Sequence, residues 1–281
     1  MIFNLTVEAF RNALIAGLLT AIAAGIIGVF IVTRRMVSIS GSIAHASLSG
    51  VGMGLITGIS PVIGALILTP LAALGMGTVV KRTKLPEDTA IGMLWATGMA
   101  IGVILAALAG STSDLSIYLF GDILSVPDAD LILMGILDLL VIVLVLRFYN
   151  ELLSVSFDEE FSRIVGISTS FLYFLVLALI SLTVVTLLRV AGIILVIALL
   201  AIPAAFARRL TYNLPKMMLF AFILSMLFIF SGLFVSLQFK LPSGAVIALL
   251  CGFTFIIFLS LYRFRNNRNG SKISGEEKSH S

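Results

Sequence analysis

The sequence predicts an all-α polytopic membrane protein with eight or nine transmembrane helices. Of its 281 residues, 60% are hydrophobic and only 11% are charged, whereas soluble domains carry about 25% charged residues. The mean hydropathy is +1.18. The apolar residues gather into long runs, and a run of about 20 helical residues is enough to cross a hydrocarbon core about 30 Å thick.

Nine apolar runs underlie this prediction. The run at 190–207 is short, and Pro203 inside it is expected to bend or break the helix because proline lacks a backbone N–H. We therefore predict eight or nine spans, with nine preferred. The runs cover 12–33, 36–58, 61–80, 88–109, 130–146, 169–188, 190–207, 217–238 and 242–262.

The positive charges predict the orientation. With nine alternating spans, all of the 18 Lys and Arg residues except Arg11, Arg189 and Lys240 fall on one side. Such an excess is typical of the cytoplasmic side, so we expect the N-terminus outside and the C-terminus in the cytoplasm. The same pattern explains the pI of 9.4 without nucleic-acid binding. We expect a transmembrane domain over 1–265 and a disordered cytoplasmic tail over 266–281.

His45 is a candidate functional residue in the second run. If the helix starts just after Arg35, His45 lies about 15 Å along it, near the middle of the membrane. An ionisable, metal-competent side chain at this depth is costly and by default suggests function. The structural alternative is a neutral imidazole that bonds to a neighbouring helix.

The segment at 150–168 predicts a short amphipathic helix over about 157–165, on the cytoplasmic side. Ser156 and Glu159 have the spacing of a capping box, and Gly166 can end the helix. Membrane-surface helices usually carry Lys and Arg on the polar face, so an acidic start favours docking to a protein. The acidic start and the apolar side are formed by Phe157, Asp158, Glu159, Glu160, Phe161, Ile164 and Val165.

The outer loop near 110–130 is acidic and carries no Lys or Arg. One interpretation is an ordinary solvated loop, and the other is a docking face or vestibule that concentrates cations. The aspartates are Asp114, Asp122, Asp128 and Asp130.

The chain lacks the common motifs of catalysis. It has no G-x-x-x-x-G-K-[ST] loop for a nucleoside triphosphate, no H-E-x-x-H and no G-x-S-x-G. Cys251 is the single cysteine, which excludes a cysteine metal cluster. We therefore expect a transport protein rather than an enzyme, driven by a gradient or by a partner.

Several segments resemble one family, in the family's order. The chain is similar to the membrane permease subunit of the ATP-binding-cassette importers for zinc, manganese and iron. The matching segments are Arg34-Arg35-Met36, His45-Ala46-Ser47-Leu48 with Gly50-Val51, the outer segment Tyr118 to Leu124, Ser156 to Gly166, Leu199 to Ala205 with its proline, and Gly232-Leu233 with Pro242-Ser243-Gly244.

This resemblance implies a permease subunit of an ATP-driven divalent-metal importer in the cytoplasmic (inner) membrane of a prokaryote. It implies a homodimer, cytoplasmic ABC ATPase subunits that bind the ATP, and an extracytoplasmic metal-binding protein. The chain itself would bind no cofactor and would carry zinc first, with manganese or iron as alternatives. His45 would be the metal ligand in transit. The ATPase-coupling residues would be Phe157, Asp158, Glu159, Glu160, Phe161, Ser162 and Gly166.

Two positions depart from the family pattern. The family commonly has an aspartate four residues before the histidine, where this chain has Gly41, and often an acid where this chain has Lys240. Loss of the carboxylate should weaken the binding of a hard cation such as Mn²⁺ more than the binding of Zn²⁺. Asp138, about 13 Å from Arg147 along its helix, could replace it if it faces the path of His45. Otherwise it is a protonated or hydrogen-bonded acid at a helix contact.

Three rival functions remain open at this point. A proton-coupled secondary transporter could use His45 and Asp138 as a relay. An ABC importer of a small organic ligand would fit the missing aspartate at Gly41. A membrane scaffold without transport is disfavoured, because it would not need buried ionisable residues.

Overall fold

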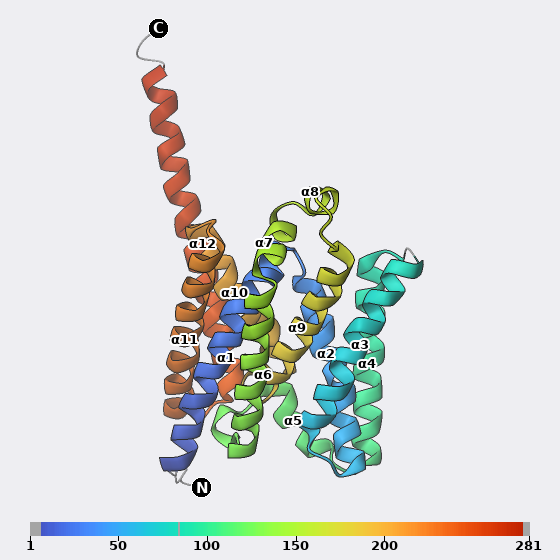
Figure 1. The fold of residues 1–281 in the computed structure, drawn as a ribbon. Helices are drawn as coiled ribbons and strands as arrows, with labels where there is room; N and C mark the ends of the chain where they lie inside the picture. Colours follow the sequence, from blue (N-terminus) through green and yellow to red (C-terminus); the bar gives the residue numbers. More distant parts are fainter. Residues whose placement is uncertain (1–6, 84, 278–281) are drawn as a thin grey trace.

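The computed structural model is an all-α bundle (Figure 1). It describes residues 7–83 and 85–277, and within these residues there is no strand. The helices in chain order are α1 (Val7–Thr33), α2 (Val37–Thr57), α3 (Pro61–Thr83), α4 (Glu87–Leu108), α5 (Thr112–Phe120), the 3-10 turn η1 (Ile123–Ser125), α6 (Asp128–Arg147), α7 (Tyr149–Phe157), α8 (Glu159–Ile164), α9 (Thr169–Ala191), α10 (Ile193–Leu210), α11 (Leu214–Phe239) and α12 (Ser243–Glu277).

Eight helices in the described part of the chain are long and apolar enough to cross a membrane: α1, α2, α3, α4, α6, α9, α11 and the first part of α12. The 18-residue α10 also joins the two ends of the bundle. It begins after Gly192, which lies against Gly121, and in its last turn Nη1 of Arg208 donates to the carbonyl of Val32 at 2.8 Å. The prediction of eight or nine membrane helices is confirmed.

Pro203 does not break α10, which continues to Leu210. The predicted break is wrong, because α10 is held between α1 and α11, and neighbouring helices sustain proline-containing helices in membranes. A bend at Pro203 stays a prediction. The chain breaks instead at Gly192, where φ is +71°. A side chain there would collide with the backbone of Gly121, so the turn requires glycine.

The bundle has two groups of helices joined by α9. In one group α2 packs against α3 and α4, and in the other α1 packs against α10 and α11, with α12 on α10 and α11. The central α9 contacts both groups and also α6. α2 is the most buried span and α4 the least. Residues of α2 are therefore enclosed by protein, whereas α4 forms an edge of the chain.

The two termini of the described chain lie at opposite ends of the bundle, with α8 at the end from which α12 continues (Figure 1). This arrangement agrees with the predicted sidedness, and the assignment of the α8 end to the cytoplasm stays a prediction. α12 continues to Glu277, so the part of the predicted tail from 266 to 277 is helical in the structure. Its disorder in solution stays a prediction as well.

Candidate metal pathway and coupling segment

His45 lies in the middle of α2 and is 7% exposed. Its Nδ1 atom is buried and makes no hydrogen bond within the described residues. The nearby serines do not donate a hydrogen bond to this nitrogen. Ser42, Ser47 and Ser49 donate instead to carbonyl oxygens three residues earlier in the same helix. A buried nitrogen without a partner is costly, and it leaves the imidazole available for a ligand from outside the chain.

Trp95 of α4 stacks on His45, a contact that the sequence analysis missed. The ring centroids lie 4.3 Å apart and the planes differ by 10°. The indole Nε1 donates to Sδ of Met99 at 3.2 Å. Trp95 is the single tryptophan of the chain. Its presence inside an apolar span was the signal in the sequence that could have marked it as a candidate site residue.

Glycines hold α4 against α2 at the level of this stack. A Cβ atom on Gly98 would lie 2.6 Å from Cα of Ala46, and one on Gly102 would collide with the backbone of Leu48. Small residues allow such close helix contact in membranes. The close contact fixes the height of Trp95 relative to His45.

A side chain of α10 occupies the space beside Gly41, where the family commonly has an aspartate. A Cβ atom on Gly41 would lie 2.7 Å from Cδ1 of Ile197. An apolar side chain therefore occupies the space where a carboxylate one turn before His45 would lie. The environment of His45 on this side is apolar.

Asp138 is 3% exposed in α6, and neither of its carboxyl oxygens has a hydrogen-bond partner in the described structure. α6 packs mainly against α1 and α9, whereas α2 packs mainly against α3 and α4. α9 lies against both helices, but the main contacts of the described helices do not bring Asp138 beside His45. Among the described residues, no group of three or more His, Cys, Asp or Glu side chains could hold a metal ion. The assignment of His45 and Asp138 as metal ligands stays a prediction.

The predicted amphipathic segment forms the short helix α8, but its cap differs from the prediction. Asp158 caps it, because Oδ1 accepts from the amide of Phe161 at 2.9 Å. Ser156 belongs to α7 and donates to the carbonyl of Leu152. The prediction of a capping box at Ser156 was wrong, because α7 continues to Phe157 and includes Ser156. Gly166, with φ +91°, follows the helix as predicted.

The apolar side chains on and beside α8 are uncovered in the described part of the chain. Phe157, Phe161, Ile164 and Val165 are 57% to 84% exposed. Ser162 is instead buried against α7, where its Oγ lies 2.7 Å from that of Ser154. The inner side of α8 thus anchors it to the bundle, and the outer side presents a short apolar surface flanked by Glu160.

A polar cluster connects α8 with the loop before α2. Oε2 of Glu159 lies 3.8 Å from Nη2 of Arg34, and Oε1 lies 3.9 Å from Nη2 of Arg163. Burial lowers the pKa of the Arg34 guanidinium, and the charge of Glu159 opposes this shift. Beside the pair is a cavity of about 240 Å³ that Glu87 and Tyr173 also line.

Three of the four outer aspartates have structural partners. Asp130 is buried and its Oδ2 lies 2.6 Å from Nε of Arg189. Asp128 accepts from Arg11 and Asn12, and Asp122 caps η1 through the amide of Leu124. The side chain of Asp114 lies outside the described part. Cations from α1 and α9 therefore balance two of these four acids, and the docking face or vestibule stays a prediction.

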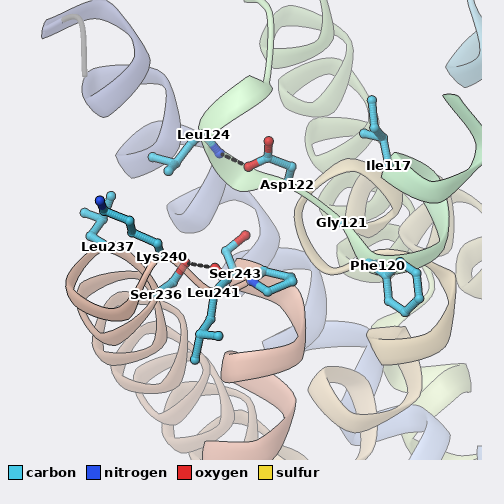
Figure 2. A pocket seen from close by; sticks show the side chains of 11 residues that line it. Ile117, Phe120, Gly121, Asp122, Leu124, Ser236, Leu237, Lys240, Leu241 and Ser243 are labelled. Atoms are coloured by element: carbon cyan, nitrogen blue, oxygen red, sulfur yellow. Dashed lines mark hydrogen bonds between the residues drawn. The ribbon is translucent and has the colours of Figure 1, made fainter. Parts of the chain in front are cut away.

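The end of the bundle that carries Asp122 has a cavity of about 630 Å³. Figure 2 shows Asp122, just before η1, and Lys240, just after α11, among the residues that line this cavity, whose other side chains are mostly apolar. Oγ of Ser236 donates to the carbonyl of Leu241 at 2.6 Å and closes the turn after α11. Lys240, at the position where the family often has an acid, has φ +55° and lines this cavity.

Comparisons with known proteins agree with these features. Residues 6–262 match the family model described as the ABC 3 transport family. An uncharacterized membrane protein (slr2045) of Synechocystis is 42% identical over 264 residues, 94% of each chain. The manganese transport system membrane protein MntC of Listeria innocua is 38% identical over 247 residues, 88% of each.

A solved structure has the same fold. One chain of PsaBC from Streptococcus pneumoniae, solved in complex with Fab, superposes with a TM-score of 0.82 at 32% identity. The match covers 90% of this chain and 91% of that one. The chain therefore belongs to the ABC 3 transport family, which confirms the resemblance to the permease subunits of ATP-binding-cassette metal importers.

Proposed function

We propose that the chain forms the translocation pathway of an ATP-driven importer of a divalent transition metal, in the cytoplasmic membrane of a prokaryote. The observation that carries this proposal is α8, which presents an exposed apolar surface beside acidic residues at one end of the bundle. A separate ATPase would bind this surface, since the sequence has no Walker loop of its own.

The metal would pass His45. Imidazole is a good ligand for zinc and a weaker one for manganese. A single imidazole does not complete a metal site, so a second copy of the chain would supply a second His45, and an external binding protein would deliver the cation. This argument supports a homodimer.

Two metals are the leading candidates as cargo. Manganese is the metal that the name of the Listeria relative gives. Zinc is the metal that an imidazole without a nearby carboxylate favours, since Ile197 fills the space beside Gly41. Competition between the two metals for transport identifies the cargo.

The test is metal uptake into proteoliposomes that contain the chain, its ATPase and its binding protein. We expect uptake to require ATP and to fall in His45→Ala, with Ser49→Ala as a control in the same helix. Asp138→Asn tests the second predicted ligand. Uptake by the chain alone, driven by a proton gradient, would contradict the proposal and support a secondary transporter. Wild-type uptake in both His45→Ala and Asp138→Asn would remove the proposed site.

A further inference from the structure

The stack between His45 and Trp95 suggests a second residue of the metal site. A metal ion bound by imidazole lies in the plane of the ring, at a nitrogen lone pair. The indole lies 4.3 Å from the imidazole and is nearly parallel to it. A parallel neighbour limits tilting of the imidazole, and this fixes the plane in which the lone pairs point.

The indole is itself held in place. Its Nε1 donates to Sδ of Met99, one turn further along α4, at 3.2 Å. The close contact of Gly98 with Ala46 holds α4 against α2, directly after His45. The imidazole plane is therefore fixed relative to α4 by its stack with the indole, which Met99 holds, and by the close packing of Gly98 on Ala46.

Core packing alone does not account for a tryptophan here. Trp95 is 41% exposed, and α4 is the least buried of the candidate spans. Simple space filling at such an edge position requires only an aliphatic side chain. What an aliphatic side chain cannot supply is an aromatic face, which attracts a positively charged group, and tryptophan does this best.

We propose that Trp95 is a positioning residue for the metal pathway. It holds the plane of the His45 imidazole and stabilises the positive charge that this ring acquires when it binds a divalent cation. The inference rests on the proposed role of His45 in metal transit and adds a residue that acts through it. Trp95 does not ligate the metal.

Metal binding to the full-length chain in detergent tests this role directly. Calorimetric titrations with Zn²⁺ and with Mn²⁺ would compare wild type, Trp95→Leu and Trp95→Phe. We expect Trp95→Leu to weaken binding about fivefold, since an aromatic–cation contact is worth about 1 kcal/mol. Trp95→Phe keeps a ring and should recover most of the affinity. Met93→Leu, at an exposed position two residues earlier on α4, is the matched control.

The single tryptophan provides an independent readout. Because Trp95 is the only tryptophan of the chain, the emission of the full chain reports this position alone. We expect a saturable change in emission on addition of Zn²⁺ or Mn²⁺. The change should disappear in His45→Ala.

The outcomes separate this inference from the proposed function. Metal transport that requires His45, with wild-type affinity in Trp95→Leu, would overturn the role of Trp95 and leave the proposed pathway intact. So would an emission that does not respond to metal in a chain whose transport requires His45. Wild-type transport in His45→Ala would overturn both. Weakened binding in Trp95→Leu, recovery in Trp95→Phe and a His45-dependent emission change together establish the role.

Discussion

The carboxylate of Glu159 lies 3.8 Å from the guanidinium of Arg34, and this ion pair links α8 to the turn before α2. The Arg34 side chain is 7% exposed and that of Glu159 is 49% exposed. α2 begins at Val37, and His45 follows eight residues later, about 12 Å along the helix. A displacement of α8 by an ATPase would reach the helix of His45 through this pair.

Breaking this link should weaken the stimulation of ATP turnover by the transported metal. We expect Glu159→Gln to lower metal-stimulated ATP turnover about fivefold, the effect of losing about 1 kcal/mol from a half-exposed ion pair. ATPase binding should persist, because the apolar surface of α8 is unchanged. Turnover with and without metal, together with co-purification of the ATPase, measures both effects.

Glu160→Gln is the control for this experiment, because it removes the same charge from the next residue, which is exposed. Equal losses in the two variants would show that the acidity of α8 matters and the pair with Arg34 does not.

The exposed apolar surface of α8 should be the contact for the ATPase. Phe161 is 57% exposed, so Phe161→Ala should change the free energy of unfolding of the isolated chain by no more than about 0.5 kcal/mol. Association with the ATPase should weaken about tenfold or more, since buried aromatic anchors at interfaces are worth 2 kcal/mol or more. Binding to the purified ATPase measures this. Phe234→Ala removes an exposed phenylalanine from α11 and should leave association unchanged; an equal loss there would contradict the prediction.

The apolar surroundings of His45 can be converted to a site with a carboxylate. In Gly41→Asp alone the new side chain meets Ile197, so we expect a loss of stability. In the double variant Gly41→Asp with Ile197→Ala the carboxylate has space beside the imidazole. The affinity for Mn²⁺ should rise more than that for Zn²⁺, by about tenfold in the ratio, because a hard cation gains more from a carboxylate oxygen.

Calorimetric titration of the full chain with both metals measures this ratio. Ile197→Ala alone is the control, because it opens the same space without adding an oxygen. A ratio that stays unchanged in the double variant would show that position 41 does not face the metal.

Asp130 and Arg189 should stabilise the end of the bundle opposite to α8. Their ion pair is short and mostly buried, with 10% and 18% of the side chains exposed. Asp130→Asn leaves a buried cation without its partner, and this should cost about 3–5 kcal/mol. Asp128→Asn breaks an exposed pair with Arg11 and should cost less than about 1 kcal/mol. Thermal unfolding of the two variants should separate them clearly, and similar melting temperatures would contradict the assignment.

Hydropathy and charge predicted the spans and the amphipathic segment because these features are local in sequence. The features that the sequence did not predict depend on contacts between residues far apart in the chain. The partners of Asp130 and Asp128 come from α9 and α1, Trp95 meets His45 only because α4 packs on α2, and Ser156 lost its capping role because α7 continues to Phe157. For Pro203, the neighbouring helices outweighed the local tendency to break.

Asp138 offers a test of whether an unfavourable residue is retained for function. Its two carboxyl oxygens are buried and have no partner in the described structure. Replacing a buried polar group that has no partner by an apolar group of similar size can be neutral or stabilising, and Asp138→Leu makes this replacement. We expect Asp138→Leu to raise the free energy of unfolding by about 1 kcal/mol and to reduce metal uptake. Unfolding of the detergent-solubilised chain and uptake into proteoliposomes measure the two effects. A more stable variant with unchanged uptake would identify Asp138 as a structural acid at a helix contact, because stability would then have improved without loss of transport.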